Sequence, residues 1–204
     1  MIITWIIIGV TFAVSYTAFQ NNELFQKLQF NAAQIVHRKQ YYRLISHAFI
    51  HANWPHLIVN MLVLYFFGRN IEAYFSHFFG NRATLYYILL YVGGILAANI
   101  LGLIKHKNNY YYNAVGASGA VSAVLFAFIF FDPWEKLYFF GILPIPGIIF
   151  AIGYLIYSYQ MGKRKTDNVA HDAHFLGAVF GFIFPVIFEP ELFSRFIDQL
   201  FSIL

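Results

Sequence analysis

Ser118 and His174 are the two residues whose side chains could act as a serine nucleophile and its base. A serine hydroxyl is a weak nucleophile until a neighbouring base accepts its proton, and an imidazole that titrates near neutral pH suits that task. The chain contains no cysteine, which excludes a thiol nucleophile, a disulfide framework and a cysteine-ligated metal. Nucleophilic catalysis by this chain must therefore use Ser, Thr or Lys, and Ser118 is the leading candidate.

His56 and Asn60 form a second polar pair. They lie four residues apart, so they share one face of a helix and can direct hydrogen-bond donors at the same point. Ser118 opens a predicted helix, where backbone N–H groups without an intrahelical partner can stabilise an oxyanion. Two simpler interpretations stay open. Ser118 can bond a carbonyl of its own helix, and His56 and Asn60 can form an ordinary polar contact at a helix start.

Small residues surround both Ser118 and His174. The glycines concerned are Gly116 and Gly119 in "GASG" and Gly177 and Gly181 in "AHFLGAVFG". Small residues let two membrane helices approach closely, and such an approach would bring the imidazole within roughly 3 Å of the hydroxyl. Packing alone also explains the glycines, so they gain a catalytic meaning only together with the polar residues.

The elements that must position these residues are membrane helices. Of the 204 residues, 60% are hydrophobic and only 11% are charged, whereas soluble domains are roughly half apolar. We therefore predict an all-α polytopic membrane protein with a single domain, residues 1–204. The apolar runs predict six spans, at about 2–19, 56–76, 84–104, 115–131, 138–158 and 169–188.

The even-numbered spans bring the polar residues together. In a six-span protein, spans 2, 4 and 6 run in the same direction, so their amino-terminal ends meet at one face. Polar side chains within a membrane are costly and tend to mark function. The residues at these ends are His56 and Asn60, then Ser118, then His171 and His174.

The segments outside the spans also have predicted places. The first run lacks the basic region of a cleaved signal peptide, so we expect a retained helix. The connection 20–55 contains apolar pieces and is expected to lie in or on the membrane interface. The segment "EPELFSRFIDQLFSIL" has helical spacing of apolar residues and predicts a short amphipathic helix on the opposite surface.

The charges indicate contact with lipid headgroups. The net charge of +4 is scattered among loops, so we expect a bilayer and no nucleic acid as partner. Loops after spans 1, 3 and 5 carry Lys27, Arg38, Lys39, Arg43, Lys105, Lys107, Lys163, Arg164 and Lys165, against Arg69, Arg82, Lys136 and Arg195 on the other side. This bias alone would place the odd-numbered loops in the cytoplasm.

A metal site is an alternative use of the histidines. His171 and His174 lie three residues apart, with His47, His51 and His56 as further imidazoles. No HExxH motif occurs, and we expect neither a metal nor another cofactor. Asp172 should point away from His174 around the helix, so no third triad member is evident. Arg43 and Glu72 are interpreted as structural anchors.

The ordered set of motifs resembles the rhomboid family of intramembrane serine proteases. The segment "YRLISHAFIHANWPHLIVNMLVLYFFGRNIE" is similar to the family's first loop and second helix, "GASG" to its nucleophile motif, and "AHFLGAVFG" to its base motif. The resemblance implies Ser118 as nucleophile and His174 as general base. It also implies an oxyanion hole formed by His56, Asn60 and the backbone N–H of Ser118.

One position departs from the family. Some bacterial rhomboids have a tyrosine four residues after the nucleophile that stacks on the catalytic histidine, and this chain has Ser122 there. Support for the imidazole must then come from elsewhere, for which Phe126 and an aromatic residue of the fifth span are both candidates.

The resemblance also implies a substrate and a location. The expected activity is hydrolysis of peptide bonds in or next to transmembrane segments of other membrane proteins. The expected location is a bacterial inner membrane with the active site toward the extracytoplasmic face, against the charge bias. Two other functions stay open: an inactive rhomboid-like protein that binds membrane-protein clients, and a transporter that uses the histidines.

Overall fold

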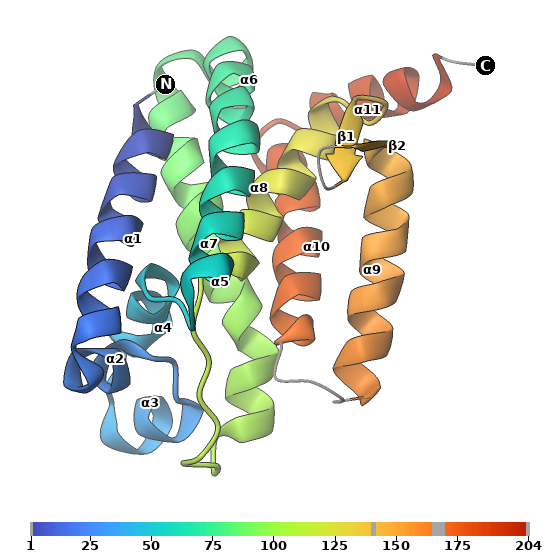
Figure 1. Cartoon of the computed structure of the whole chain (residues 1–204). Helices are drawn as coiled ribbons and strands as arrows, with labels where there is room; N and C mark the ends of the chain where they lie inside the picture. The colour runs from blue at the N-terminus through green and yellow to red at the C-terminus, as the bar shows by residue number, and fades with distance from the viewer. Residues whose placement is uncertain (1, 140–141, 165–169, 203–204) are drawn as a thin grey trace.

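The computed structural model describes residues 2–139, 142–164 and 170–202, and these are mostly helical (Figure 1). The long helices are α1 (Ile3–Gln20), α5 (Trp54–Val63), α6 (Arg69–Phe79), α7 (Ala83–His106), α8 (Ser118–Phe131), α9 (Gly147–Arg164) and α10 (His171–Phe188). A π-helical turn, η2 (Leu64–Gly68), joins α5 to α6 without a break. The helical, membrane-type fold expected from the apolar runs is confirmed.

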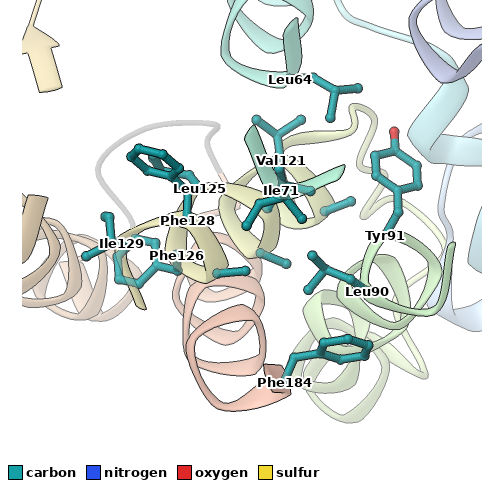
Figure 2. Packing of buried hydrophobic residues seen from close by; sticks show 14 of the residues in the cluster. Leu64, Ile71, Leu90, Tyr91, Val121, Leu125, Phe126, Phe128, Ile129 and Phe184 are labelled. Atoms are coloured by element: carbon teal, nitrogen blue, oxygen red, sulfur yellow. The ribbon is translucent and has the colours of Figure 1, made fainter. Parts of the chain in front are cut away.

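Helix α8 forms the centre of the bundle. Every residue from Gly119 to Phe131 is buried, as expected for a helix that is hydrophobic on all sides. It contacts α6, α7, η2, α9 and α10. Figure 2 shows Val121, Leu125 and Phe128 of α8 within this core, whose other labelled side chains include Leu90 of α7 and Phe184 of α10.

Three segments of the described chain are long and apolar enough to cross a membrane. They are Ile3–Gln20, the continuous helical run Trp54–His106, and His171–Phe188, and Ser118–Phe131 is a shorter apolar helix. The Trp54–His106 run reverses direction between α6 and α7 at η3 (Gly80–Arg82), where Gly80 has φ +52°. Helices α6 and α7 consequently lie side by side (Figure 1).

The prediction of a fifth span at 138–158 was wrong at its start. Residues Lys136–Phe139 (β1) and Leu143–Pro146 (β2) form an antiparallel hairpin, and α9 begins only at Gly147. Pro144 and Pro146 lack the N–H that a helix interior requires, so the helix starts directly after the second proline. Residues 140–141 of the predicted span lie outside the described residues.

The fourth span also begins later than predicted. Its helix starts at Ser118 rather than at residue 115, because Gly116 has φ +114°, which a right-handed helix does not allow. The predicted runs 2–19, 84–104 and 169–188 agree with α1, α7 and α10 to within a few residues. Residue 169 lies outside the described part of the chain, as does Lys165.

The connection 20–55 is a folded cap rather than a free loop. It contains α2 (Asn22–Leu28), α3 (Ala32–Arg38), α4 (Arg43–Ser46) and a 3₁₀ turn, η1 (His47–Phe49), and α3 and α4 pack on α7. The guanidinium of Arg43 donates to the carbonyls of Gln26 and Gln29 at 2.9 and 2.7 Å. Arg43 is therefore the internal anchor of this cap, as predicted.

The opposite end of the bundle has its own anchors. The Glu72 carboxylate accepts the N–H groups of Ile3 and Thr4 and so caps the start of α1. The predicted carboxyl-terminal helix is present as α11 (Glu191–Phe201), at the end of the bundle away from α2 and α3 (Figure 1). The indole of Trp134 donates to two of its carbonyls.

Candidate active site

Ser118 and His174 are in direct contact. The Nε2 atom of His174 lies 2.7 Å from the Oγ atom of Ser118. Ser118 is the first residue of α8, and His174 lies in the first turn of α10. The pair is part-buried, so an imidazole and a hydroxyl from distant parts of the sequence share a hydrogen bond at two adjoining helix starts.

Two of the four motif glycines, Gly177 and Gly181, explain how these helices come so close. A Cβ atom at Gly177 would collide with the carbonyl oxygen of Gly119, and one at Gly181 would collide with the carbonyl oxygen of Ala123. A Cβ atom at Gly119 would overlap the side chain of Ala98 on α7. Backbone therefore packs on backbone along α8 and α10, and this close packing sets the distance between Ser118 and His174.

The turn before Ser118 is held by the 20–55 cap. Phe30 and Ala114 exchange two backbone hydrogen bonds, of 2.9 and 3.1 Å, and the Gly116 N–H donates to the His47 carbonyl at 2.9 Å. The Ala117 N–H donates to Nε2 of His51 at 3.4 Å. Because these bonds restrain the residues directly before α8, they restrain the position of Ser118.

The partners of His51 define its protonation. Because a backbone N–H can only donate, Nε2 accepts from Ala117, and Nδ1 then carries the proton and donates to the Ser15 hydroxyl at 3.0 Å. The Ser15 hydroxyl in turn donates to the Phe49 carbonyl. Burial, with a smaller contribution from the charge of His56, lowers the pKa of His51 from 6.5 to about 3, so neutral His51 matches the hydrogen bonds that it makes.

His47 is a second neutral histidine in the same cap. Its Nε2 lies 3.0 Å from the Asn99 amide nitrogen of α7, which can only donate. Burial lowers the pKa of His47 to about 4, although the backbone at Leu44 opposes that shift. Both histidines were considered as metal ligands from the sequence alone. In the described part of the chain no three His, Asp or Glu side chains gather as they would around a metal ion.

His56 lies against the same turn, whereas Asn60 lies one helical turn further along α5. A Cβ atom at Gly116 would be 2.6 Å from Cε1 of His56, so only glycine leaves room for this imidazole. Asn53 caps α5 by accepting the His56 N–H. Asn60 is buried, and its amide donates to the His56 carbonyl at 2.8 Å. The structure thus brings His56 to the Ser118 turn and leaves the amide of Asn60 on its own helix.

The comparison with known families agrees with this arrangement. The family model described as "Rhomboid domain" matches residues 38–191. The chain belongs to the rhomboid family. That range contains Ser118, His174, His56 and Asn60, and it confirms the resemblance identified in the sequence.

Several curated rhomboid proteins are similar to this chain. RHOMBOID-like protein 12, mitochondrial, of Arabidopsis thaliana is 31% identical over 150 residues, which cover 66% of this chain and 43% of the relative. Rhomboid-related protein 2 of Mus musculus is 27% identical, covering 71% and 47%. Presenilin-associated rhomboid-like protein A, mitochondrial, of Danio rerio is 29% identical, covering 68% and 35%. The chain thus spans less than half the length of each of these relatives.

In this rhomboid, the aromatic ring next to His174 that Ser122 cannot provide comes from α9. The ring of Tyr154 lies 6.5 Å from the His174 ring, at an interplanar angle of 25°, and its hydroxyl lies 2.7 Å from Oγ of Ser122. Phe126, the other candidate, packs on Tyr154 at 5.4 Å. The ring that lies nearly parallel to the imidazole therefore belongs to a residue of α9. The His171 ring also contacts the imidazole, edge-on at 6.0 Å. The sequence named the fifth span, but no feature distinguishes Tyr154 from the other aromatic residues of that span.

Asp172 takes no part in the Ser118–His174 pair. Its carboxylate binds Lys105 of α7 at 2.6 Å, and a Cβ atom at Gly162 of α9 would approach that carboxylate to 2.5 Å. The expectation that Asp172 points away from His174 is borne out. The neighbouring His171 is buried and packs edge-on against Tyr157 of α9.

A cavity next to the pair opens between the end of α7 and the start of α10. It has a volume of about 410 Å³, and Tyr112 and Asp172 belong to its wall. A smaller cavity of about 30 Å³ is lined by Ser118 and Gly119. The residues common to both walls are Ala98, Asn99, Ala114, Ala170 and Ala173. The Ser118 turn therefore adjoins a space large enough for several water molecules.

Proposed function

We propose that this rhomboid is an intramembrane serine endopeptidase that uses Ser118 as nucleophile and His174 as general base. The observation that carries the proposal is the 2.7 Å contact between His174 Nε2 and Ser118 Oγ. A nucleophile and base within hydrogen-bond reach are the geometric signature of activated serine. Family membership supports the same function, since rhomboids are in general serine proteases of the membrane.

The reaction follows from the groups around the pair. His174 removes the proton of the Ser118 hydroxyl as Oγ attacks the substrate carbonyl, and the imidazolium then protonates the leaving amine. The Ser118 backbone N–H stands at the open start of α8 and can bind the oxyanion. His56, which lies against Gly116, and Asn60 complete the proposed oxyanion hole. A water molecule then hydrolyses the acyl-enzyme on Ser118.

The proposed substrates are transmembrane segments of other proteins and the residues next to them. A helix hides its carbonyls in hydrogen bonds, so the substrate must unwind locally before Ser118 can attack. Residues with low helix propensity near the cleaved bond would ease that step. The two adjoining cavities support this proposal, because they give the second reactant, water, a route to the hydroxyl.

We further propose that residues 1–204 form one domain with six spans, formed by α1, α5–α6, α7, α8, α9 and α10. The starts of α8 and α10 would then face the extracytoplasmic side, as the family resemblance implies. The expected bacterial inner membrane gains no support from the relatives, since two of them are named as mitochondrial. The proposed location is therefore within a membrane, as an integral membrane protein.

Fluorophosphonate labelling of the detergent-purified full chain tests the function. The probe should label the wild-type protein, and both Ser118→Ala and His174→Ala should abolish labelling and cleavage of a transmembrane reporter in liposomes. Ser76→Ala is the matched control, because the Ser76 hydroxyl donates to the backbone carbonyl of Glu72 within α6 and lies on neither α8 nor α10. Persistent labelling of the Ser118→Ala protein, or cleavage by the folded His174→Ala protein, would overturn the proposal.

A further inference from the structure

The imidazole of His174 needs a fixed orientation to serve as a base, and the structure shows which side chain lies over it. The Tyr154 ring lies nearly parallel to the imidazole, with 6.5 Å between centroids and 25° between planes. This distance falls within the range of offset aromatic pairs. Asp172, the carboxylate nearest in sequence, is bound to Lys105 instead. The side of the imidazole toward α9 is therefore bounded by an aromatic ring.

Tyr154 is itself held by several contacts. Its hydroxyl and that of Ser122 form a 2.7 Å hydrogen bond, and Ser122 is only 5% exposed. Phe126 packs on the ring from α8 at 5.4 Å, and Phe150, one turn earlier on α9, stacks on it at 5.7 Å. A ring bounded in this way has little freedom to turn about its side-chain bonds.

The spacing of Ser118 and Ser122 connects the contacts that hold Tyr154 to the nucleophile. The two serines lie four residues apart on α8 and so share one face of the helix. Ser118 reaches His174 of α10, and Ser122 reaches Tyr154 of α9. One stripe of α8 thus sets the position of the hydroxyl and, through Tyr154, the position of the imidazole.

We propose that Tyr154 is a positioning residue for His174 and that its hydrogen bond with Ser122 holds it in place. This inference rests on the proposed function, because it assigns Tyr154 a role only if His174 acts as the base. Tyr154 acts on the geometry of the base and touches no reacting atom. Loss of the Ser122–Tyr154 bond should therefore lower kcat and leave KM unchanged.

The test compares kcat and KM of the full chain in liposomes for Tyr154→Phe, Ser122→Ala and the double variant. Each single change removes the same hydrogen bond, so each should lower kcat about fivefold. The double variant should be no slower than either single one, because the bond can be lost only once. Ser122→Thr, which keeps a hydroxyl, should restore most of kcat, and Tyr154→Leu, which also removes the ring, should lower it about 30-fold.

Tyr157→Phe is the matched control, since the same substitution on the same helix affects a ring that packs on His171. Its kcat should equal that of the wild type. Wild-type kcat in folded Tyr154→Phe and Ser122→Ala proteins, or additive losses in the double variant, would overturn the positioning role. That outcome leaves the proposed function standing if Ser118→Ala is inactive, whereas an active Ser118→Ala protein would refute the proposed function itself.

Discussion

Nε2 of His51 accepts the backbone N–H of Ala117, the residue directly before Ser118, at 3.4 Å. His51 comes from the cap formed by residues 20–55, and its other ring nitrogen is bonded to Ser15 of α1. The start of α8 is therefore restrained by groups that lie more than 60 residues away in the chain. Because the Ser118 backbone N–H is part of the proposed oxyanion hole, this restraint bears directly on the proposed chemistry.

Replacing His51 by Ala should slow the reaction and destabilise the fold. The substitution leaves the buried N–H of Ala117 without its acceptor, a loss of about 1–3 kcal/mol of unfolding free energy. It also frees the turn that positions Ser118, so we expect kcat to fall about tenfold. Reporter cleavage in liposomes and thermal unfolding in detergent measure the two effects.

His77→Ala is the control for His51→Ala, because His77 is exposed near the end of α6. It should leave kcat and the unfolding temperature at their wild-type values. If His51→Ala unfolds at the wild-type temperature and cleaves at the wild-type rate, the restraint through Ala117 contributes neither to stability nor to the reaction.

The stability of the protein should fall as the pH drops below about 6.5. The folded-state pKa of His47 is lowered to about 4 and that of His51 to about 3, whereas both are near 6.5 in an unfolded chain. Above pH 6.5 neither state binds these protons, so the two histidines contribute no pH dependence. Below it the unfolded chain binds protons that the folded chain does not, and the free energy of unfolding decreases down to about pH 4 for His47 and about pH 3 for His51.

Thermal unfolding in detergent between pH 8 and pH 5 measures this effect independently of catalysis. At pH 5 the expected loss is about 2 kcal/mol for each histidine. A His51→Gln variant, which cannot be protonated, should show a smaller decrease than the wild type. An unfolding temperature that does not change from pH 8 to pH 5 would contradict the assignment of buried neutral histidines.

The sequence predicted the Ser118–His174 contact for a physical reason that the structure bears out. Small residues at positions 116–119 and 177–181 indicated that two helices touch, and polar residues at their starts indicated where. Apolar runs likewise located α1, α7 and α10. The start of α9 was missed because hydropathy alone does not distinguish an apolar hairpin from an apolar helix in the residues before Pro146. The sequence left Phe126 and the aromatic residues of the fifth span as candidates for the contact with His174. The choice of Tyr154 among them depends on how α9 packs, which no local pattern encodes.

Gly181→Ala should separate the two helices that carry the Ser118–His174 pair. The new Cβ atom would collide with the backbone of Ala123, and a backbone carbonyl cannot rotate away as a side chain can. Overpacking of this kind costs about 1–3 kcal/mol of unfolding free energy. Because α10 must shift to relieve the collision, His174 should move away from Ser118, and fluorophosphonate labelling should slow at least about tenfold.

Gly153→Ala provides the comparison on α9. A Cβ atom there would have no atom within 4 Å, so the substitution should leave labelling unchanged and stabilise the helix by about 0.5–1 kcal/mol. Equal unfolding temperatures and labelling rates for the two glycine variants would show that close α8–α10 packing does not set the geometry of the pair.

Asp172→Asn should distinguish a Ser–His dyad from a Ser–His–Asp triad. In a triad, loss of the carboxylate that orients the histidine slows turnover by a factor of about 10⁴. Here the carboxylate binds Lys105, with the two side chains 33% and 39% exposed, and an ion pair this exposed contributes about 0–1 kcal/mol of stability. We therefore expect turnover within about twofold of the wild-type rate and a similarly small change in unfolding temperature.

Lys105→Gln removes the same ion pair from the other side and should match Asp172→Asn in both measurements. If Asp172→Asn instead slows turnover roughly a thousandfold or more while Lys105→Gln is unaffected, Asp172 must turn toward His174 during the reaction and act as the third member of a triad.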